Sequence, residues 1–435
     1  MSTVYAAHRA RLLAQFGEGI IIIPTAPEVI RSRDTHFPYR PDSYFSYLTG
    51  FCEPDAVLVL LGGAKPQSWL FCRPRDAERE QWDGYRYGPQ RAANAFNLDA
   101  AFTLDALDEQ LIKQLGNTPK VGFPLGANAT WDTRLTTWLN TVRRQARNGE
   151  QAPDCVLDIR DLLDEMRLFK DEQELHHLRQ AAAINVRAHC RAMQMVRPNW
   201  YEYQLEAELL HEYYRHGSRF PAYSSIVAGG KHACILHYVE NNARLRAGDL
   251  VLVDAGCEWH GYASDITRTY PINGRFSGAQ RDLYQVVFAA QEAALASIVP
   301  NAPWDAPHQA AVRVLTQGLL DLGLLVGRLE DVLAQGDYRR FYMHRTGHWL
   351  GMDVHDVGRY KLGDAWRPLQ AKMVFTVEPA LYIPAADDIP AAFWHTGIRL
   401  EDNVVVTEQG YENLTAGAPR SIADIEAWMA QGTKA

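Results

Sequence analysis

Short apolar runs alternate with amphipathic stretches over the first third of the chain. The apolar runs are rich in isoleucine, leucine and valine, and they predict strands at residues 20–23, 56–61, 68–72 and 121–123. Helical spacing of apolar positions predicts helices at residues 1–16, 104–115 and 131–148. Strands that alternate with helices are typical of an α/β layer, so we predict an α/β N-terminal domain over residues 1–165.

The pattern changes after residue 165. Between Asp171 and Pro198, apolar residues recur three and four positions apart, which predicts a helix. Further helices are predicted at residues 201–216, 279–298 and 308–322, among runs with strand character. Helices on one face of a mostly antiparallel sheet form an α+β domain, and we predict such a domain over residues 166–435.

A polar and aromatic segment with two prolines, residues 34–51, predicts a loop in the first domain. Two interpretations stay open for it: an ordered surface loop, or a segment at the rim of an active site or at a subunit contact. Trp82, in the sequence EQWDGYRYG, is open to the same two interpretations.

Composition narrows the class of protein. The 435 residues are 47% hydrophobic and 22% charged, with a net charge of −8 and no basic tract, which argues against a nucleic-acid partner. The longest apolar run, GIIIIP, is far shorter than the roughly 20 residues of a membrane span, and the N-terminus lacks the features of a signal peptide. The six cysteines form no CxxC pair, and we predict reduced thiols in a cytoplasmic protein without membrane contact.

The segment 249–270, DLVLVDAGCEWHGYASDITRTY, carries the first candidate chemistry. An apolar strand ends on Asp254, a turn with two glycines follows, and the chain returns through Asp265. A hairpin of this kind brings both carboxylates to one face, where burial is costly unless a cation or hydrogen-bond donors meet them. Either aspartate alone is expected to cap a turn, whereas the pair predicts a shared proton or a shared metal ion.

Three later segments supply matching side chains. Residues 341–358 contain three histidines among glycines, and residues 373–382 and 397–406 are strand-like runs interrupted by charged residues. The side chains concerned are His344, His348, His355, Glu378, Arg399 and Glu401. Four carboxylates and at least one imidazole suit a divalent ion such as Mn²⁺, with Zn²⁺ and Co²⁺ as alternatives, and bridging carboxylates would hold two ions.

This ordered set of residues resembles the pita-bread metallopeptidases, a family that includes methionine aminopeptidase, prolidase and aminopeptidase P. The motifs that carry the resemblance are LVLVDAGCEWHGYASDITRTYP, HWLGMDVHDVG, TVEPALYI, GIRLEDNVVVT and, in the first domain, YRPDSYFSYLTGFCEPDAVLVL. They are most similar to the aminopeptidase P branch, over nearly the whole chain. The resemblance implies a pita-bread second domain with a curved, mostly antiparallel sheet. It also implies a first domain that serves in a homo-oligomer, a dimer or a tetramer.

The resemblance implies which residues bind metal: Asp254, Asp265, His348, Glu378 and Glu401. Asp265 and Glu401 would bridge two divalent ions, most simply Mn²⁺, that hold a water or hydroxide between them. Glu378 would also accept the proton from that nucleophile.

Four further residues match positions around the metals. His237 and His355 would contact substrate or assist proton transfer, and His344 would bind substrate. Arg399 has two interpretations of equal weight, a structural ion pair and an anchor for a substrate carbonyl or carboxylate.

The resemblance implies an aminopeptidase that releases the N-terminal residue from peptides with proline second. Chain length and the N-terminal domain favour aminopeptidase P over methionine aminopeptidase. Prolidase, which cleaves Xaa-Pro dipeptides on the same ligands, is the alternative, and Arg399 or Arg345 would then hold the carboxylate after proline. A metal-free pita-bread module that only binds proteins is a remote alternative, because all five ligand positions carry competent side chains.

Overall fold

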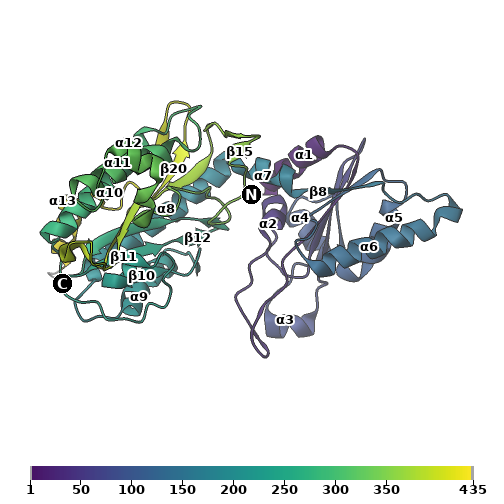
Figure 1. Ribbon diagram of the computed structural model, residues 1–435. Coiled ribbons are helices and arrows are strands. Elements are labelled where there is room, and N and C mark those ends of the chain that lie inside the picture. The colour runs from purple at the N-terminus through teal and green to yellow at the C-terminus, as the bar shows by residue number, and fades with distance from the viewer. Residues whose placement is uncertain (1, 433–435) are drawn as a thin grey trace. The chain divides into compact units, whose positions relative to one another are not determined.

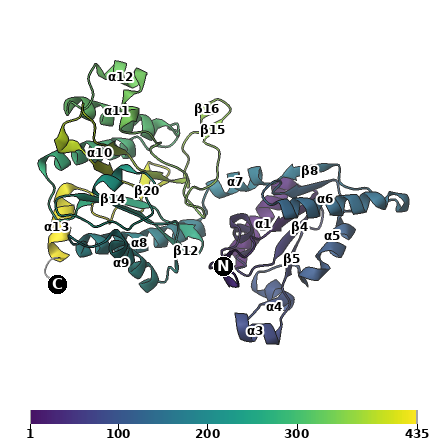
Figure 2. The ribbon, with the colours of Figure 1, turned by 60° about the horizontal axis from the view of Figure 1, so that its bottom comes forward.

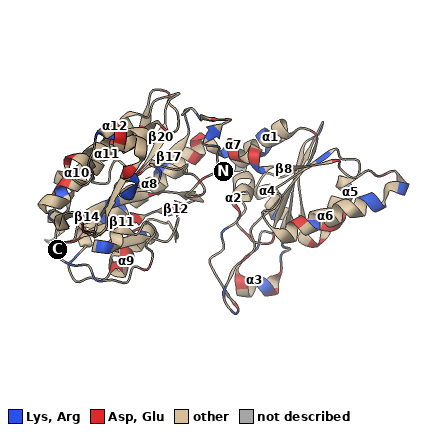
Figure 3. Ribbon diagram, in the orientation of Figure 1, with Lys and Arg blue, Asp and Glu red and all other residues tan. Residues whose placement is uncertain are grey.

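The computed structural model describes residues 2–432 (Figure 1). The chain forms two compact units, Met1–Met166 and Arg167–Ala435, and each has a hydrophobic core of its own. Acidic and basic residues are interspersed along the helices of both units, as Figure 3 shows. Every helix within residues 2–432 is too short or too polar to cross a lipid bilayer.

The first unit is built on a mixed six-stranded sheet in the order β6-β5-β4-β1-β7-β8. The central β1 (Gly19–Pro24) pairs antiparallel with β4 (Val57–Gly62) and parallel with β7 (Lys120–Phe123). These three strands and β5 confirm the four strands that were predicted from the apolar runs. The sequence pattern missed β6 and β8, because their apolar runs are only three residues long and their residues are half-buried or exposed. The remaining strands of the sheet are β5 (Gln67–Cys72), β6 (Ala100–Thr103) and β8 (Cys155–Asp158).

Helices flank this sheet, and those predicted from the sequence are confirmed. Leu111 on α5 and Trp138 on α6 pack into its core. A short hairpin of β2 (Ile30–Ser32) and β3 (Thr35–His36) follows β1, and α7 (Arg160–Leu168) carries the chain into the second unit. The helices of the first unit are α1 (Ser2–Phe16), α2 (Ser43–Thr49), α3 (Ala77–Asp83), α4 (Gly88–Ala95), α5 (Leu107–Leu115) and α6 (Ala129–Arg144).

The loop predicted at residues 34–51 is wrong over its second half, where α2 forms. The Asp42 carboxylate accepts a hydrogen bond from the backbone N–H of Phe45 at 2.9 Å and caps the helix. Gly50, at φ 65°, ends it in the left-handed conformation that glycine adopts without cost. Phe45 and Leu48 form the buried face of α2, so the aromatic character of the segment reflects helix packing.

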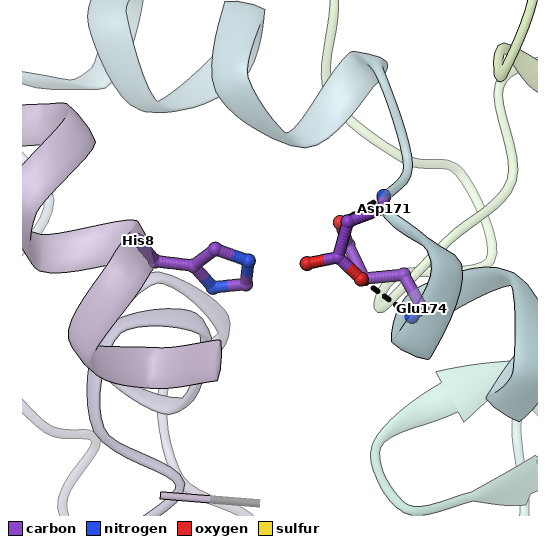
Figure 4. Close-up of side chains that lie close together, drawn as sticks. All are labelled: His8, Asp171 and Glu174. Carbon is purple, nitrogen blue, oxygen red and sulfur yellow. Dashed lines mark hydrogen bonds between the residues drawn. The ribbon is translucent and has the colours of Figure 1, made fainter. Parts of the chain in front are cut away.

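In the second unit, α8 (Glu172–Met195) begins with a capping box. The Asp171 carboxylate accepts hydrogen bonds from the backbone N–H groups of Gln173 and Glu174, and the Glu174 carboxylate accepts one from the backbone N–H of Asp171. Figure 4 shows the two hydrogen bonds between Asp171 and Glu174. The other helices of this unit are α9 (Glu202–Arg215), α10 (Gly278–Ala296), α11 (Ala306–Asp321), α12 (Leu329–Gln335) and α13 (Ile422–Gly432).

The predicted hairpin at residues 249–270 is two nested hairpins. β11 (Leu250–Ala255) pairs antiparallel with β14 (Ile266–Pro271), so that Asp254 lies opposite Thr267. Between them, a smaller hairpin extends from the tip, where Gly256 approaches Ser264 so closely that a Cβ atom would lie 1.8 Å from the Ser264 carbonyl oxygen. The strands that complete these sheets are β9 (Phe220–Pro221), β10 (Ile226–Gly229), β12 (Cys257–Trp259) and β13 (Tyr262–Ala263).

Two later strand pairs are each broken in the middle. Glu378 and Pro379 separate β17 from β18, because proline has no N–H for the ladder, and Leu400 and Glu401 separate β19 from β20. β17 pairs with β20, β18 pairs with β19, and a bridge between Thr267 and Glu401 joins this group to β14. The strands are β15 (Lys361–Leu362), β16 (Ala365–Trp366), β17 (Val374–Val377), β18 (Ala380–Ile383), β19 (Thr396–Arg399), β20 (Asp402–Val406) and β21 (Tyr411–Asn413).

The helices of the second unit lie on the outside of these strands (Figure 2). α8 packs against β12, β13 and β14, and α10 packs against β17, β18 and β19. All strand pairs among the described residues of this unit are antiparallel. The structure therefore confirms an α/β first domain and an α+β second domain with antiparallel sheets.

Candidate metal centre

A cavity of about 880 Å³ lies in the second unit, and four carboxylates contribute to its lining. The structure brings together all nine candidate site residues selected from the sequence. The residues are Asp254, Asp265, His348, Glu378, Glu401, His237, His344, His355 and Arg399.

Asp254 and Asp265 meet at one tyrosine. Asp254 lies near the end of β11 and Asp265 directly precedes β14, as the hairpin pattern predicted. The Tyr223 hydroxyl lies 2.6 Å from Asp254 Oδ1 and 2.5 Å from Asp265 Oδ1. A hydroxyl has one proton to donate, so it satisfies one of these oxygens at a time. The Asn403 side chain on β20 forms two hydrogen bonds with the backbone of Asp265. Its amide oxygen accepts from the Asp265 N–H, and its amide nitrogen donates to the Asp265 carbonyl.

His348 faces the same carboxylates from a segment without helix or strand. Its Nε2 lies 3.3 Å from Asp265 Oδ2, 3.7 Å from Glu378 Oε1 and 4.0 Å from Glu401 Oε1. Its Nδ1 lies 3.0 Å from the Trp349 carbonyl oxygen, which can only accept, so Nδ1 carries a proton and Nε2 is the nitrogen that faces the carboxylates.

Gly347 allows the histidine segment to approach β17. A Cβ atom at position 347 would lie 2.0 Å from the Thr376 carbonyl oxygen. The Thr376 hydroxyl accepts a hydrogen bond from the His348 N–H at 3.1 Å, which fixes the backbone next to the imidazole. The glycine in the HRTGH sequence therefore sets the position of His348.

The breaks between strands place the two glutamates. Glu401 accepts a hydrogen bond from the Thr267 hydroxyl at 2.6 Å, and its N–H donates to the Thr267 carbonyl at 3.0 Å. Glu378 lies with Oε1 3.4 Å from the Thr376 hydroxyl and Oε2 3.6 Å from His344 Nδ1. Asp265, His348 and Glu401 offer ligand atoms that all lie within 4.8 Å of one another.

Burial strongly affects the protonation of this cluster. Burial raises the pKa of Glu378 to about 7 against the attraction of His348 and Arg399. Burial, then the Asp265 and Glu378 carboxylates, raises the pKa of Glu401 well above its ordinary value. Burial also raises the pKa of Asp254 against the pull of Arg399. Burial is the largest cause of all three shifts, and neighbouring carboxylates add to it, so the charged forms of these acids are costly in this site.

Asp265 and His348 behave as an ion pair. Burial disfavours the charge on both, but their mutual attraction outweighs burial, lowering the pKa of Asp265 and raising the pKa of His348 to about 9. The donor set of carboxylate oxygens and one imidazole nitrogen fits divalent ions such as Mn²⁺, Zn²⁺ or Co²⁺.

Arg399 is buried and all three of its guanidinium nitrogens bond within the protein. Nη2 donates to Asp254 Oδ2 at 2.6 Å, Nη1 to the Tyr382 hydroxyl at 2.7 Å, and Nε to the Thr267 hydroxyl at 3.1 Å. This geometry matches the structural ion pair that was one of the two interpretations of Arg399.

The three other histidines lie in different surroundings. The His344 ring is fixed at both nitrogens: Nδ1 lies 2.7 Å from the Arg345 carbonyl oxygen and Nε2 lies 3.0 Å from the Tyr382 hydroxyl. Burial lowers the pKa of His344 to about 3, so the ring is neutral and its Nε2 accepts from Tyr382. The His355 ring packs edge-on to His348, with centroids 4.3 Å apart, and burial lowers its pKa. His237 is exposed and lines the cavity.

Sequence reasoning missed Tyr223, Thr267 and Tyr382, which hold the candidate ligands in place. Thr267 follows Asp265 by two positions, so strand alternation would have placed the two side chains on one face. Tyr382 belongs to the predicted strand run and its role depends on Arg399 across the pair of β18 and β19. Tyr223 lies in a segment with no local pattern that points to the carboxylates.

Three aromatic side chains pack together next to His348: Trp349, Trp304 and Tyr360. The Trp349 side chain is fully buried, and its ring centroid lies 3.9 Å from that of Trp304 and 5.4 Å from that of Tyr360. Trp304 and Tyr360 also line the cavity.

Two cations gather at Trp366, which lies on the β15–β16 hairpin and lines the cavity. The Arg345 guanidinium and the Lys361 ammonium lie 4.8 Å and 4.6 Å from the centre of the indole ring. Arg345 also forms an ion pair with Asp305 at 2.7 Å.

Comparison with known proteins matches both units. Residues 176–408 match the model of metallopeptidase family M24, and residues 5–121 match that of the aminopeptidase P N-terminal domain. The chain is 44% identical to the Xaa-Pro aminopeptidase of Haemophilus influenzae over 98% of its own length and 96% of that protein.

Solved structures show the same likeness in three dimensions. The Pseudomonas aeruginosa aminopeptidase PepP superimposes with a TM-score of 0.99 at 47% identity, over 100% of this chain and 99% of that one. Zinc-substituted Escherichia coli aminopeptidase P, solved in complex with product, superimposes with a TM-score of 0.97 at 42% identity, over 99% of each chain.

Proposed function

Because the chain belongs to metallopeptidase family M24, we propose that it is an Xaa-Pro aminopeptidase, which hydrolyses the bond between an N-terminal residue and a following proline. The observation that carries the proposal is the convergence of Asp265, His348 and Glu401 within 4.8 Å in a large cavity. The relatives that match over nearly their whole length carry the same activity in their names.

The proposed metal ligands are Asp254, Asp265, His348, Glu378 and Glu401. Asp265 shares the Tyr223 hydroxyl with Asp254 and also faces His348, and Glu401 faces His348 as well. Asp265 and Glu401 would bridge two ions, of which Mn²⁺ is our first choice. Zinc is the alternative, since a zinc-substituted form of the Escherichia coli relative has been solved. When bound, such ions lower the pKa of water and polarise the carbonyl of the bond to be cleaved.

The chain's own residues supply the remaining steps. Glu378 is proposed to accept the proton of the attacking water, because its carboxylate lies beside both His344 and His348. His237 and His355 are proposed to contact the substrate and to assist protonation of the proline nitrogen, which leaves as a secondary amine. Arg399 is proposed to orient the ligand Asp254, to which it donates a hydrogen bond.

The arrangement of cations favours an aminopeptidase over a prolidase. A prolidase needs a cation that receives the carboxylate after proline, and the two candidates were Arg399 and Arg345. Arg399 is already engaged by Asp254, Tyr382 and Thr267, and Arg345 by Asp305 and the Trp366 ring. Both arginines therefore have partners within the protein, which argues against either as the carboxylate receptor of a prolidase.

We also propose that the enzyme is a cytoplasmic homo-oligomer, a dimer or a tetramer. Large side chains on the first unit are strongly exposed in the single chain, among them Trp82 at 82% and Tyr85 at 90%. Exposed aromatic side chains are typical of subunit contacts. Sedimentation of the wild-type chain beside a Trp82→Ser variant tests whether this surface is used.

The deciding experiment compares an Xaa-Pro-Xaa tripeptide with the matching Xaa-Pro dipeptide. Protein stripped by a chelator should cleave neither, and addition of Mn²⁺ should restore release of the first residue from the tripeptide. Cleavage confined to the dipeptide would promote prolidase. Full activity of the stripped protein, or no cleavage with any added divalent ion, would contradict the proposal.

A further inference from the structure

A buried carboxylate outside the cavity, Glu202, holds the segment that carries His237. Glu202 is the first residue of α9, and its side chain is fully buried. A buried carboxylate is costly unless donors surround it. It is absent from the cavity lining and from the proposed chemistry, so its donors indicate its role.

The Glu202 carboxylate has four hydrogen-bond partners, two on each oxygen. Oε1 lies 2.9 Å from the Gly229 backbone nitrogen and 3.2 Å from His232 Nδ1. Oε2 lies 2.8 Å from the Tyr238 hydroxyl and 2.8 Å from the Ala243 backbone nitrogen. All four partners belong to residues 229–243, so one side chain of a neighbouring helix holds this segment at four points.

The cavity-lining part of this segment lies between these anchors. Leu236 and His237 fall between His232 and Tyr238, whose rings stack with centroids 4.5 Å apart, and Val239 follows directly. The tip itself has little apolar packing, because Ile235 and Val239 are each 53% exposed and His237 is exposed. Hydrogen bonds at the base of the turn, more than burial at its tip, fix where His237 points.

We propose that Glu202 is a positioning residue that orders residues 229–243 and thereby presents His237 to the substrate. This inference rests on the proposed function for the part that concerns catalysis. Displacement of a substrate-contacting group by about 1 Å costs on the order of 10²-fold in rate. The metal ligands lie on other segments, so loss of Glu202 should spare metal binding.

The test uses Glu202→Gln in the full chain. An amide replaces one acceptor oxygen with an NH₂ group, so in either orientation one backbone N–H of the segment, that of Gly229 or that of Ala243, faces another donor. We expect faster amide hydrogen exchange within residues 229–243, unchanged bound metal, and a fall in kcat/KM of about 10²-fold. Glu208→Gln is the matched control, since Glu208 lies on the same helix and pairs with Arg191.

A double variant separates positioning from general loss of structure. If Glu202 acts through His237, adding Glu202→Gln to His237→Ala should cost little more than His237→Ala alone. Tyr238→Phe, which removes one donor only, gives a milder second variant and should also speed exchange in this segment. Unchanged exchange in both variants, or losses that multiply in the double variant, would overturn the inference.

The exchange readout does not depend on substrate identity. A wild-type protein that cleaves no Xaa-Pro peptide would refute the proposed function, and comparison of exchange in Glu202→Gln and Glu208→Gln would still test the role of Glu202.

Discussion

The two units differ in what they bury among their apolar side chains. β1 in the first unit and β11 in the second are both buried at all six positions, but β1 is aliphatic and ends on a proline, whereas β11 carries Asp254. Within residues 2–432, every buried aspartate and glutamate belongs to the second unit. The first unit relies on an apolar core, and the second has an apolar core plus a set of buried acids.

The buried acids of the second unit fall into two kinds. Asp402 is matched by Arg268, and Asp356 by Lys170 and Arg167, so that cations lower the pKa of each carboxyl despite burial. In the cavity, Asp254 pairs with Arg399 and Asp265 with His348, whereas burial raises the pKa of both Glu378 and Glu401. The acids paired with lysine or arginine outside the cavity hold the fold together, and the two cavity glutamates mark the place where a cation from outside is needed.

The largest effect on activity and metal content is expected when a proposed bridging ligand is removed. Asp265→Ala and Glu401→Ala should each abolish peptide cleavage and reduce bound metal, because each removes an oxygen shared between two ions. Metal content by mass spectrometry and a tripeptide assay measure both effects. Ile22→Val in β1 is the control, expected to cost about 0.5–1.5 kcal/mol of stability while activity and metal stay unchanged. Near-wild-type turnover with two bound ions in either alanine variant would refute the ligand assignment.

Replacement of either of two histidines should lower the rate of cleavage without loss of bound metal. His237→Ala and His355→Ala are expected to lower kcat by about 10²–10⁴-fold, the scale of a lost acid–base group, with metal content retained. His211→Ala, on the exposed side of α9, is the control and should leave the rate unchanged. Loss of metal in either site variant would instead assign that histidine a structural role.

The acids paired with lysine or arginine outside the cavity should affect stability. Asp402→Asn leaves Arg268 buried without its charge partner, and we expect the free energy of unfolding to fall by about 3–5 kcal/mol. The matched surface change is Glu330→Gln, which breaks an exposed pair with Arg313 and should leave the free energy of unfolding nearly unchanged. Denaturant unfolding measures both. Equal losses in the two variants would show that burial does not distinguish these pairs.

The smallest effect is expected at Arg345. Since Asp305 and Trp366 already engage this side chain, Arg345→Met should change kcat/KM by less than about fivefold for both dipeptide and tripeptide, the scale of one exposed ion pair. A large loss confined to the dipeptide would show that Arg345 receives a substrate carboxylate and would favour prolidase.

Strands with an aliphatic run could be predicted from the sequence, whereas edge strands could not. β1 and β11 were predictable because each contains a run of isoleucine, valine or leucine. β8 lies at the edge of the sheet next to β7 and exposes three of its four residues, and its run Cys-Val-Leu is too short to stand out in the sequence. α2 was mistaken for a loop because prolines and tyrosines surround it, although its Asp42 cap was a usable signal.

The acids of the site could be predicted because a charge in an apolar run is conspicuous. Glu378 and Glu401 stand out for that reason, and the structure brings both to the cavity that holds Asp254 and Asp265. The partners of these acids could not be predicted. Tyr223 and Glu202 act on residues far along the chain, and only the tertiary fold defines which donors they meet.

The close pair of Trp304 and Trp349 gives the protein an optical signal at its own active site. With ring centroids 3.9 Å apart, the excited states of the two indoles couple, and Trp349 directly follows His348 in the chain. Near-ultraviolet circular dichroism of the pair should therefore respond when the imidazole next to it changes partner. The wild-type chain could then be titrated with ions in a cuvette, without a label and without a substrate.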